Sequence, residues 1–291
     1  MFALTHLSDL HLASQPSMSE LAGKRGLGFV NWQRKRKYIH RPGVLDAITR
    51  DLKAQSFDHV AVTGDLVNLS LPAEYAQAKR WLQALGDPGD VTVVPGNHDA
   101  YVRSAEKSPA ASWGEYMRGD DGRDRFPFIR RRGNVALIAL STGVPTGPFM
   151  ATGRLGQRQL TDFAEALEQT RASFRVVLIH HPPVSPPRRF LRRLTDAAIF
   201  RGVLAAKGAE LLLHGHDHRR LFNWLQGPDG KKIPAIGAPS ASAHARHADE
   251  DPAGYHIFHI DSTGDAWRCE MIARERGVDG TIRETERQTI Y

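Results

Sequence analysis

Histidine, aspartate and asparagine residues recur in five short clusters along this chain of 291 residues. Each cluster directly follows a short apolar run of the kind that forms a β-strand. The clusters are Asp9-Leu10-His11, Gly64-Asp65, Gly96-Asn97-His98-Asp99, His180-His181 and Gly215-His216-Asp217-His218. Because the loops after the strands of an open α/β sheet converge at one edge, we expect the five clusters to form one site.

These residue types fit a centre of two metal ions that hydrolyses a phosphate ester. Two cations about 3.5–4 Å apart can activate a water molecule and hold a phosphate in line with it. Imidazole nitrogens and carboxylate oxygens tolerate hydroxide and phosphate as co-ligands, and one carboxylate can bridge both ions. The predicted ligands are Asp9, His11, Asp65, Asn97, His180, His216 and His218. A bridging Asp65 would give each ion four protein ligands.

The spacing within the clusters leads to two expectations about the backbone. Two pairs of ligands are separated by one residue, and an extended backbone would place each pair on one side. These pairs are Asp9 with His11 and His216 with His218. Three clusters contain a glycine that suits a tight turn in which the backbone crowds a ligand. These glycines are Gly64, Gly96 and Gly215.

In this order, the five clusters resemble the pattern of the calcineurin-like metallophosphoesterase superfamily: Asp-x-His, Gly-Asp, Gly-Asn-His-Asp/Glu, His and Gly-His-x-His. The resemblance extends from about Leu4 to about Ser240. It implies that Asp65 bridges two ions. The first ion would be held by Asp9, His11, Asp65 and His218, and the second by Asp65, Asn97, His180 and His216.

The same resemblance implies two catalytic residues that do not bind metal. His98 would face the leaving group as a proton donor or an electrostatic stabiliser. Asp99 would hold neighbouring groups in position, as the orienting partners of metal ligands do.

The chain departs from the protein Ser/Thr phosphatases of this superfamily. Where their motif reads Gly-Asp-x-Val-Asp-Arg-Gly, this chain has Asn68 and Leu69 in place of the second Asp and the Arg. Three other segments resemble small bacterial class III cyclic-nucleotide phosphodiesterases. These segments are 7–11, 180–183 and 237–240.

This resemblance implies a metal-dependent phosphoric diester hydrolase that uses a metal-bound hydroxide, with cyclic nucleotides as the first candidate substrates. One alternative is a hydrolase of lipid-linked phosphodiesters or pyrophosphates at a membrane surface, and a less favoured one is a phosphomonoesterase. A non-catalytic scaffold would be expected to have lost ligands, and this chain retains all seven. The ligand set suits Mn and Fe, with Zn as a further candidate.

Some histidines remain outside the predicted ligand set. His180 and His181 are adjacent, so only one of them is expected to face the metals, and the resemblance favours His180. The role of His181 stays open. His244 and His247 are interpreted as histidines of an exposed loop.

The elements between the clusters predict an α/β fold. Helices are expected after Pro42, Pro72 and Gly156, where apolar residues recur at helical spacing. Strands are expected at 2–7, 60–63, 91–94, 135–140, 175–179 and 211–213, with further strands after about 253. Alternation of strands and helices predicts layers with helices outside. The resemblance specifies a four-layer sandwich of two mixed β-sheets flanked by helices, with residues 1–291 as a single domain.

A basic segment accounts for much of the net charge of +7. Residues 24–41 contain seven Lys or Arg residues and no acidic residue, with Phe29, Trp32 and Tyr38 between them. One interpretation is a solvated helix whose basic stems cover its aromatic side chains. The other is a flap at about 20–42 that contacts an anionic substrate or the surface of an anionic membrane. No nucleic-acid-binding module is recognised, so charge alone does not favour nucleic acid as a partner.

Composition sets the remaining expectations. The single cysteine, Cys269, excludes an intrachain disulfide. Residues 1–10 resemble a first strand and not a signal peptide. No run approaches the roughly 18 apolar residues of a membrane span. We therefore expect a cytoplasmic protein, and its oligomeric state is open, with a homodimer as one alternative.

Overall fold

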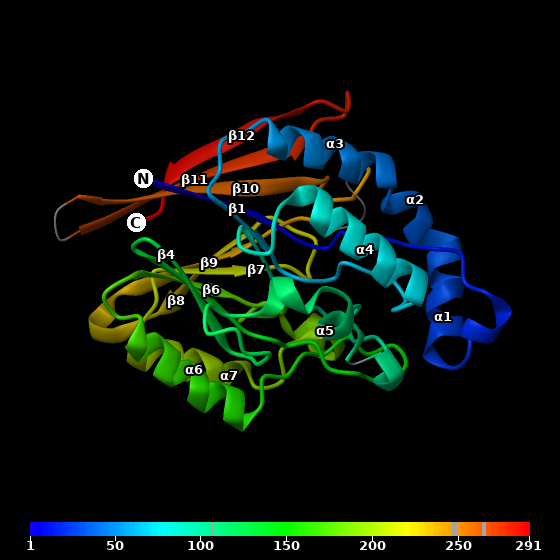
Figure 1. Cartoon of the computed structure of the whole chain (residues 1–291), viewed down its shortest axis with the longest axis horizontal. Helices are drawn as coiled ribbons and strands as arrows, with labels where there is room; N and C mark the ends of the chain where they lie inside the picture. Colours follow the sequence, from blue (N-terminus) through cyan, green and yellow to red (C-terminus); the bar gives the residue numbers. More distant parts are fainter. Residues whose placement is uncertain (106, 246–249, 264–265) are drawn as a thin grey trace.

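The computed structural model of the chain describes residues 1–105, 107–245, 250–263 and 266–291. Two six-stranded β-sheets form its centre (Figure 1). The strands are β1 (Phe2–Leu7), β2 (His59–Val62), β3 (Val91–Val93), β4 (Phe128–Arg132), β5 (Val135–Ala139), β6 (Phe174–Leu178), β7 (Leu211–His214), β8 (Leu221–Gln226), β9 (Lys232–Gly237), β10 (Gly254–Thr263), β11 (Ala266–Arg276) and β12 (Ile282–Thr289).

The helices lie mostly outside the sheets (Figure 1). The α-helices are α1 (Lys24–Asn31), α2 (Lys37–Ile39), α3 (Pro42–Lys53), α4 (Pro72–Leu85), α5 (Ser108–Trp113), α6 (Gln157–Gln169) and α7 (Ala197–Lys207). Shorter helical turns are η1 (Met18–Glu20), η2 (Trp32–Arg36), η3 (Arg103–Ala105), η4 (Gly114–Met117), η5 (Pro187–Arg192) and η6 (Pro228–Gly230). Of these short turns, η2 is π-helical and the others are 3₁₀-helical.

Both sheets are mixed, and each contains a run of parallel strands. The first has the order β12-β11-β10-β1-β2-β3, and the second has the order β4-β5-β6-β7-β9-β8. In the first sheet β1, β2 and β3 are parallel neighbours. In the second, β5, β6, β7 and β9 are parallel neighbours. The carboxyl ends of the parallel strands therefore lie at one edge of each sheet, where ligands bind in folds of this kind.

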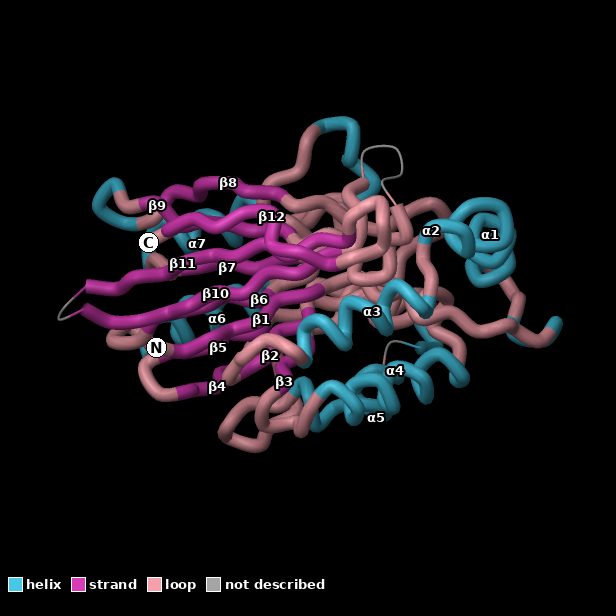
Figure 2. Tube along the Cα trace, turned by 90° about the horizontal axis from the view of Figure 1, so that it is seen from above, coloured by secondary structure: helices cyan, strands magenta, loops and turns pink. Residues whose placement is uncertain are grey.

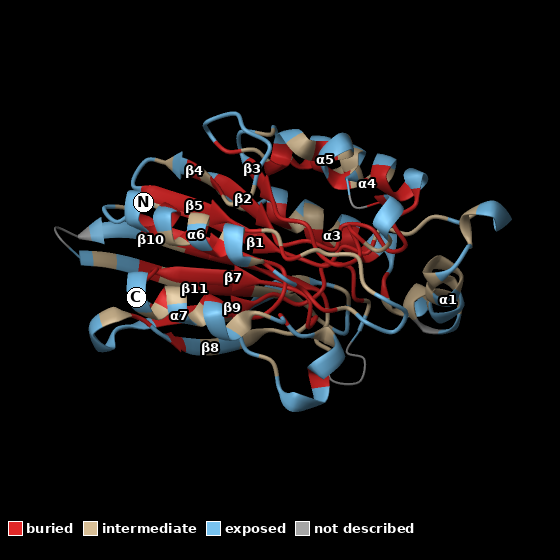
Figure 3. Cartoon of the chain, turned by 90° about the horizontal axis from the view of Figure 1, so that it is seen from below, coloured by how far each residue is buried: buried red, intermediate tan, exposed pale blue. Residues whose placement is uncertain are grey.

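Alternating residues of the second sheet fill two different cores. Leu137 of β5 packs in a core between the sheets that also includes residues of α3 and α4. Its neighbour Ile138 packs in a second core with residues of α6 and α7, such as Phe163 and Phe200. Burial on both faces explains why the central strands are continuous apolar runs, and Figure 3 shows these strands as buried. The predicted four-layer sandwich is confirmed.

The elements expected from the sequence are present, with bounds shifted by about a residue. For example, the strand expected at 60–63 is β2, and the helix expected after Pro42 is α3. Helix α3 begins at Pro42, a residue suited to a first turn because it has no N–H to leave unpaired. It buries Val44, Ile48 and Leu52, which are spaced four residues apart.

The basic segment forms α1, η2 and α2, one after the other. Figure 2 shows α1 and α2 at one end of the molecule, beyond the loops that follow the carboxyl end of β1. None of the residues of α1 is fully buried. Within the described residues, no helix combines the length and the apolar character needed to cross a membrane.

Candidate metal centre

Three of the predicted ligands form a first group at the end of β1. The Nε2 atoms of His11 and His218 lie 2.9 Å apart. The Oδ1 atom of Asp9 lies 3.2 Å from Nε2 of His218 and 3.7 Å from Nε2 of His11. All three side chains are buried. The group thus brings together two clusters that are more than 200 residues apart in sequence.

The other four predicted ligands form a second group. The Nε2 atom of His180 lies 3.3 Å from Oδ2 of Asp65, from Oδ1 of Asn97 and from Nδ1 of His216. These side chains are also buried. The structure therefore assembles all seven predicted ligands into two groups whose donor atoms converge.

Asp65 lies between the two groups. One set of ligand atoms within 4.8 Å of one another comprises Asp65, His180 and His216. A second such set comprises Asp65, His11 and His98. A carboxylate in this position is able to reach a cation in either group.

The donor set fits two cations on geometric and chemical grounds. Ligands about 2.1 Å from one cation lie roughly 3.0–3.4 Å from each other, and most of the spacings above fall close to that range. Oδ1 of Asp9 is buried and has no hydrogen-bond partner among the described residues. A buried carboxylate oxygen without a partner is costly, and a cation would satisfy it.

Hydrogen bonds orient three of the imidazole rings. Nδ1 of His180 donates to the carbonyl of Thr63 at 2.6 Å, which leaves Nε2 as the free lone pair. Nε2 of His216 donates to the carbonyl of Arg192 at 2.8 Å, so that Nδ1 faces the site. These contacts fix which nitrogen is available to a metal, as orienting partners do in metalloproteins.

Glu250 orients the third ring. Its carboxylate accepts a hydrogen bond from Nδ1 of His218 at 3.0 Å, so Nε2 of His218 is directed at Asp9 and His11. The sequence analysis did not find Glu250, because a lone acidic residue 32 positions after its partner has no recognisable pattern.

The ligands adopt an unusual backbone conformation, which corrects one expectation. Five of the seven have a positive φ angle between 48° and 71°, although none is a glycine. They are Asp9, His11, Asp65, His216 and His218. The expectation that the Asp9–His11 and His216–His218 pairs lie on extended backbone was therefore wrong. The left-handed conformation directs both side chains of a pair into the site, and such strain is typical of functional sites.

Close backbone packing explains the glycines of the clusters. Gly64 has a φ of 92°, and a Cβ atom there would lie 2.6 Å from the backbone nitrogen of Gly96. A side chain at Gly96 would collide with the carboxylate of Asp65, and one at Gly215 would collide with Ser8. The expected crowding of the backbone around the ligands is present.

The buried carboxylates of the site favour protonation of two of the neighbouring imidazole rings. Burial opposes a charge on His180, but Asp65 and Asp9 outweigh it and raise the pKa of His180 to about 9. Burial likewise opposes a charge on His218, while Glu250 and Asp9 raise its pKa to about 9. Burial by itself would raise the pKa of Asp65, but His180 and His98 hold it below its usual value. The carboxylates of the site therefore favour cations bound next to them.

His98 lies beside both groups with its two ring nitrogens engaged. Nδ1 donates to the carbonyl of Asn68 at 2.5 Å. Nε2 therefore accepts, and Nη1 of Arg36 donates to it at 2.8 Å. The backbone N–H of His98 also donates to Oδ1 of Asp65 at 2.7 Å, which ties this residue to the proposed bridging ligand.

Asp99 organises the backbone around Asp65. Its carboxylate accepts hydrogen bonds from the N–H groups of Asp65, Leu66, Val67 and Gly96 at 2.8–3.2 Å. It therefore lies where an orienting residue was expected from the sequence.

The ring of His181 packs against that of His216, with centres 4.3 Å apart, but both of its nitrogens have partners outside the donor groups. Its Nδ1 atom lies 2.7 Å from the hydroxyl of Thr142, and its Nε2 atom donates to the carbonyl of Ala151 at 3.1 Å. Burial and the neighbouring His180 lower its pKa to about 3. His181 thus joins the loops around the site. Of the two later histidines, His244 is partly exposed and His247 lies outside the described residues.

The basic segment reaches the site, as one of its two interpretations expected, but the residues that make the contacts were not predicted. Arg36 contacts His98 and also donates to Oδ1 of Asn68 at 3.3 Å. His40, at the end of the same segment, is buried against His11, with ring centres 4.5 Å apart. Net charge marked the segment as a whole, but no periodic pattern distinguished these two positions from their neighbours.

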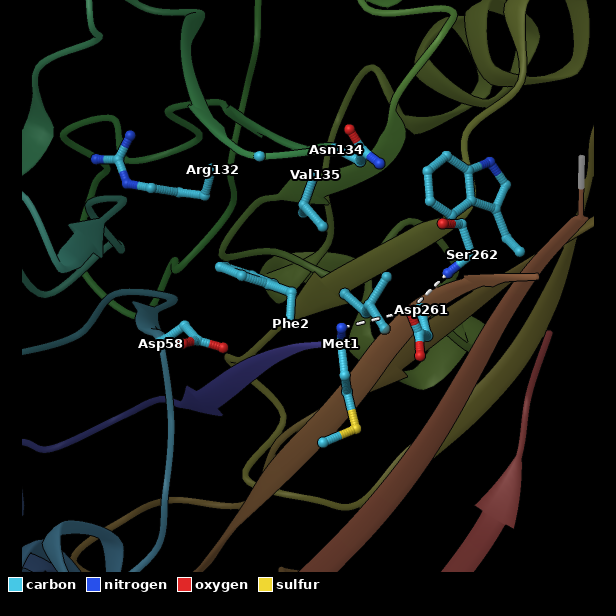
Figure 4. A pocket seen from close by; sticks show the side chains of 11 residues that line it. Met1, Phe2, Asp58, Arg132, Asn134, Val135, Asp261 and Ser262 are labelled. Carbon is cyan, nitrogen blue, oxygen red and sulfur yellow. Dashed lines mark hydrogen bonds and ion pairs between the residues drawn. The ribbon is translucent and has the colours of Figure 1, made fainter. Parts of the chain in front are cut away.

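A pocket of about 240 Å³ opens beside His98 and Asn97. Three basic side chains line it, namely Lys24, Arg36 and Arg192. A larger hollow of about 410 Å³ lies near Met1, where the N-terminal amino group forms an ion pair with Asp261 at 3.3 Å (Figure 4). The lining of that hollow includes none of the predicted ligands, whereas Asn97 lines the pocket beside His98. The pocket beside His98 is therefore the candidate substrate site.

Comparison with known proteins agrees with this architecture. A probable cyclic nucleotide phosphodiesterase of Synechococcus sp. is 27% identical over 275 residues, which cover 92% of this chain and 91% of that protein. Purple acid phosphatase PPD1 from yellow lupin shares the fold with a TM-score of 0.63 and 13% identity. Sulfate thiohydrolase SoxB of Thermus thermophilus does so with a TM-score of 0.52 and 19% identity.

The two solved structures are longer than this protein. The alignments cover 99% of this chain but only 53% and 55% of those chains, so this chain spans about half their length. At these identities the likeness concerns the fold alone. The model of the calcineurin-like phosphoesterase family matches residues 2–220, a stretch that contains every predicted ligand. The chain therefore belongs to the calcineurin-like phosphoesterase family of metal-dependent phosphoester hydrolases.

Proposed function

We propose that this protein is a phosphodiesterase that uses two metal ions. The observation that carries this proposal is the convergence of seven buried donor residues into two groups on either side of Asp65. Asp9, His11 and His218 would hold one ion, and Asn97, His180 and His216 the other, with Asp65 shared. When bound, the ions would supply an activated water molecule and neutralise charge on the phosphoryl oxygens. The ligand types favour Mn or Fe, with Zn as a further candidate.

The protein itself would contribute position and charge. His98 and Arg36 lie together beside Asn97, so they would face the oxygen that leaves or the oxygens of the phosphoryl group. Asp99 would keep the Asp65 turn in place through its four N–H bonds. Preorganised donors of this kind stabilise charge as it develops in the transition state.

A cyclic nucleotide is the first candidate substrate. This proposal is supported by the Synechococcus relative, whose name describes it as a probable cyclic nucleotide phosphodiesterase and which aligns over most of both chains. Hydrolysis would open the cyclic diester to a nucleoside monophosphate. We also propose that the chain forms a single domain, because the predicted ligands come from positions 9 to 218 and the site needs most of the chain. A cytoplasmic location is a further part of the proposal.

Exposed apolar side chains near the pocket favour a second candidate, a lipid-linked diester. Leu27 and Val30 of α1 are each 48% exposed, and Phe149, which lines the pocket, is 82% exposed. Phe190 of η5 is exposed too, and η5 supplies Arg192 to the same pocket. Apolar side chains among basic ones suit contact with an anionic lipid surface.

A substrate panel with added Mn tests the proposal. The panel compares bis(4-nitrophenyl) phosphate, 4-nitrophenyl phosphate, cyclic AMP and a diester phospholipid in mixed micelles. We expect the diesters to be hydrolysed at least tenfold faster than the monoester. Faster hydrolysis of the monoester would overturn the assignment as a diesterase. The ratio of cyclic AMP to micellar lipid turnover separates the two candidate substrates.

A further inference from the structure

The pocket beside His98 is lined by three cations that come from two distant parts of the chain. Lys24 and Arg36 belong to the basic segment, and Arg192 belongs to η5. Arg36 donates to His98 and Asn68, and Arg192 donates to the carbonyl of His216 at 3.3 Å. Lys24 donates to the hydroxyl of Thr146 at 2.8 Å and lies 4.3 Å from the centre of the Tyr101 ring.

These three cations have neutral partners in place of carboxylates. Among the residues that the structure describes, no acidic side chain lies within 4 Å of the charged nitrogens of Lys24, Arg36 or Arg192. Glu250, which attracts Arg36 and Arg192 electrostatically, forms its ion pair with His218. Arg36 is in addition largely desolvated, which lowers its pKa despite the attraction of Asp65. Burial lowers the pKa of Lys24 to about 8. A bound anion would relieve these costs.

The charge of the metal centre does not require these cations. Two divalent ions contribute four positive charges, and Asp9 and Asp65 contribute two negative charges. An ordinary phosphodiester and an anionic nucleophile contribute one negative charge each, so the centre is balanced. Lys24, Arg36 and Arg192 then add three positive charges, and Glu250, which attracts Arg36 and Arg192, offsets one of them. The positive charge that remains in a half-buried pocket is unfavourable.

We propose that Lys24, Arg36 and Arg192 bind a second phosphate group, so that the preferred substrate is a pyrophosphate diester. This inference rests on the proposed phosphodiesterase activity but not on cyclic nucleotides as its substrate. Arginine side chains suit phosphate because the guanidinium offers several N–H donors in one plane. The second phosphate would lie in the pocket beside His98, next to the phosphate held at the metal centre.

The reaction is balanced without a further reactant. A water oxygen forms a bond to one phosphorus, and the bridging P–O bond breaks. The electron pair leaves with the second phosphate, which becomes a monophosphate ester, and the two protons of water are released or distributed between the two products. Because a phosphate is a good leaving group, the cations need only stabilise its charge. The geometry of His98 agrees with this, since Arg36 already donates to its Nε2 atom.

A matched pair of substrates tests the inference on the Mn-loaded protein. The deoxydinucleotide dApdA contains two nucleosides and one phosphate, whereas diadenosine diphosphate contains two nucleosides and two phosphates. We expect KM to be at least tenfold lower for the second compound, because the better leaving group by itself would raise kcat and not the affinity. Lys24→Gln and Arg192→Gln should each reduce that preference by about tenfold, the value of one charge-assisted hydrogen bond. Arg34→Gln, an exposed charge in η2 that is absent from the pocket lining, is the matched control and should leave the preference unchanged.

A binding measurement keeps the inference separate from the proposed function. Calorimetry with the methylene-bridged analogue of diadenosine diphosphate requires no turnover, and we expect Lys24→Gln and Arg192→Gln to weaken binding about tenfold. Equal preference of the native protein for the two esters, or equal binding by the variants and Arg34→Gln, would overturn the second-phosphate site. Failure of the proposed function would look different, because the Mn-loaded protein would then hydrolyse neither ester nor bis(4-nitrophenyl) phosphate.

Discussion

Nη1 of Arg36 lies 2.8 Å from Nε2 of His98, which joins the basic segment to the candidate catalytic residue. The sequence analysis treated residues 24–41 as a unit that is either a solvated face or a flap. The structure divides this unit, because Arg36 faces the site whereas Arg34 is exposed. Tests of the segment must therefore separate these two arginines.

The first prediction concerns His98. His98→Ala should retain both metal ions and lose roughly 10²–10⁴-fold in turnover if the ring supplies a proton or aligned charge to the leaving group. The loss should be smaller for 4-nitrophenolate esters than for alkyl esters, because nitrophenolate leaves without protonation. Hydrolysis rates of the native protein and of His98→Ala with both ester types, together with the metal content of the variant, check this prediction. Equal losses with the two leaving groups would contradict the assignment.

The second prediction concerns the exposed Arg34 and the half-buried Lys37, two residues of the basic segment that do not line the pocket beside His98. Replacing Arg34 and Lys37 together with Gln should leave metal content and hydrolysis of bis(4-nitrophenyl) phosphate nearly intact. It should weaken binding to anionic vesicles, and the difference should fade as salt rises because exposed charges are screened. Vesicle sedimentation at low and high ionic strength measures this. If binding is unaltered at low salt, these two residues have no membrane role and the lipid-surface alternative loses its support.

The third prediction concerns Glu250, which orients His218. Glu250→Gln should weaken binding of the ion at Asp9, His11 and His218 by roughly 10–100-fold, as changes to orienting partners usually do. Binding of the other ion should change much less. Glu165→Gln on the exposed side of α6 is the matched control. Metal titration followed by calorimetry would show one weakened site, and two unaltered sites would refute the role of Glu250.

The fourth prediction concerns stability and pH. His59 is buried at the start of β2, where its Nε2 atom lies 2.7 Å from the hydroxyl of Thr92. Burial, with repulsion from Arg132 and Arg130, lowers its pKa to about 3. The unfolded chain therefore binds a proton at His59 below about pH 6.5 whereas the folded protein does not. The stability that a neutral His59 contributes is present above pH 6.5 and is lost as the pH falls towards 3.

At pH 5 this loss amounts to about 2 kcal/mol for His59. His59→Gln should reduce the fall in the free energy of unfolding between pH 7 and pH 5 by a similar amount. Urea unfolding with a chelator present measures this without a contribution from metal release. If the free energy of unfolding falls equally in the variant and the native protein between pH 7 and pH 5, His59 becomes charged in the folded state.

The sequence predicted the fold because its signals are local. The apolar runs before each cluster became β1, β2, β3, β6 and β7, and the proline-led helices became α3 and α4. The convergence of the seven predicted ligands could be expected because each cluster follows a strand. The β8–β9 hairpin was missed, because the exposed residues Phe222 and Trp224 are apolar and so hide the alternation of burial along β8 from the sequence.

The remainder of the site depends on contacts between distant residues. Glu250 meets His218 across 32 positions, and Arg36 meets His98 across 62 positions. Neither contact has a sequence pattern, since it depends on how loops return to the sheet edge. The left-handed conformation of Asp9 and His216 was missed for a related reason, because non-glycine residues adopt it only where the surrounding structure imposes it.

Metal analysis of Asp65→Ala tests the central claim most directly. The native protein, loaded with Mn and passed through a desalting column, should retain two metal equivalents and hydrolyse bis(4-nitrophenyl) phosphate. The variant should retain at most one equivalent and lose hydrolysis, because Asp65 is the carboxylate common to both groups. Its circular dichroism spectrum should match that of the native protein, which would show that the fold persists. Two full equivalents in a folded Asp65→Ala protein would contradict the proposal that this carboxylate joins two metal ions.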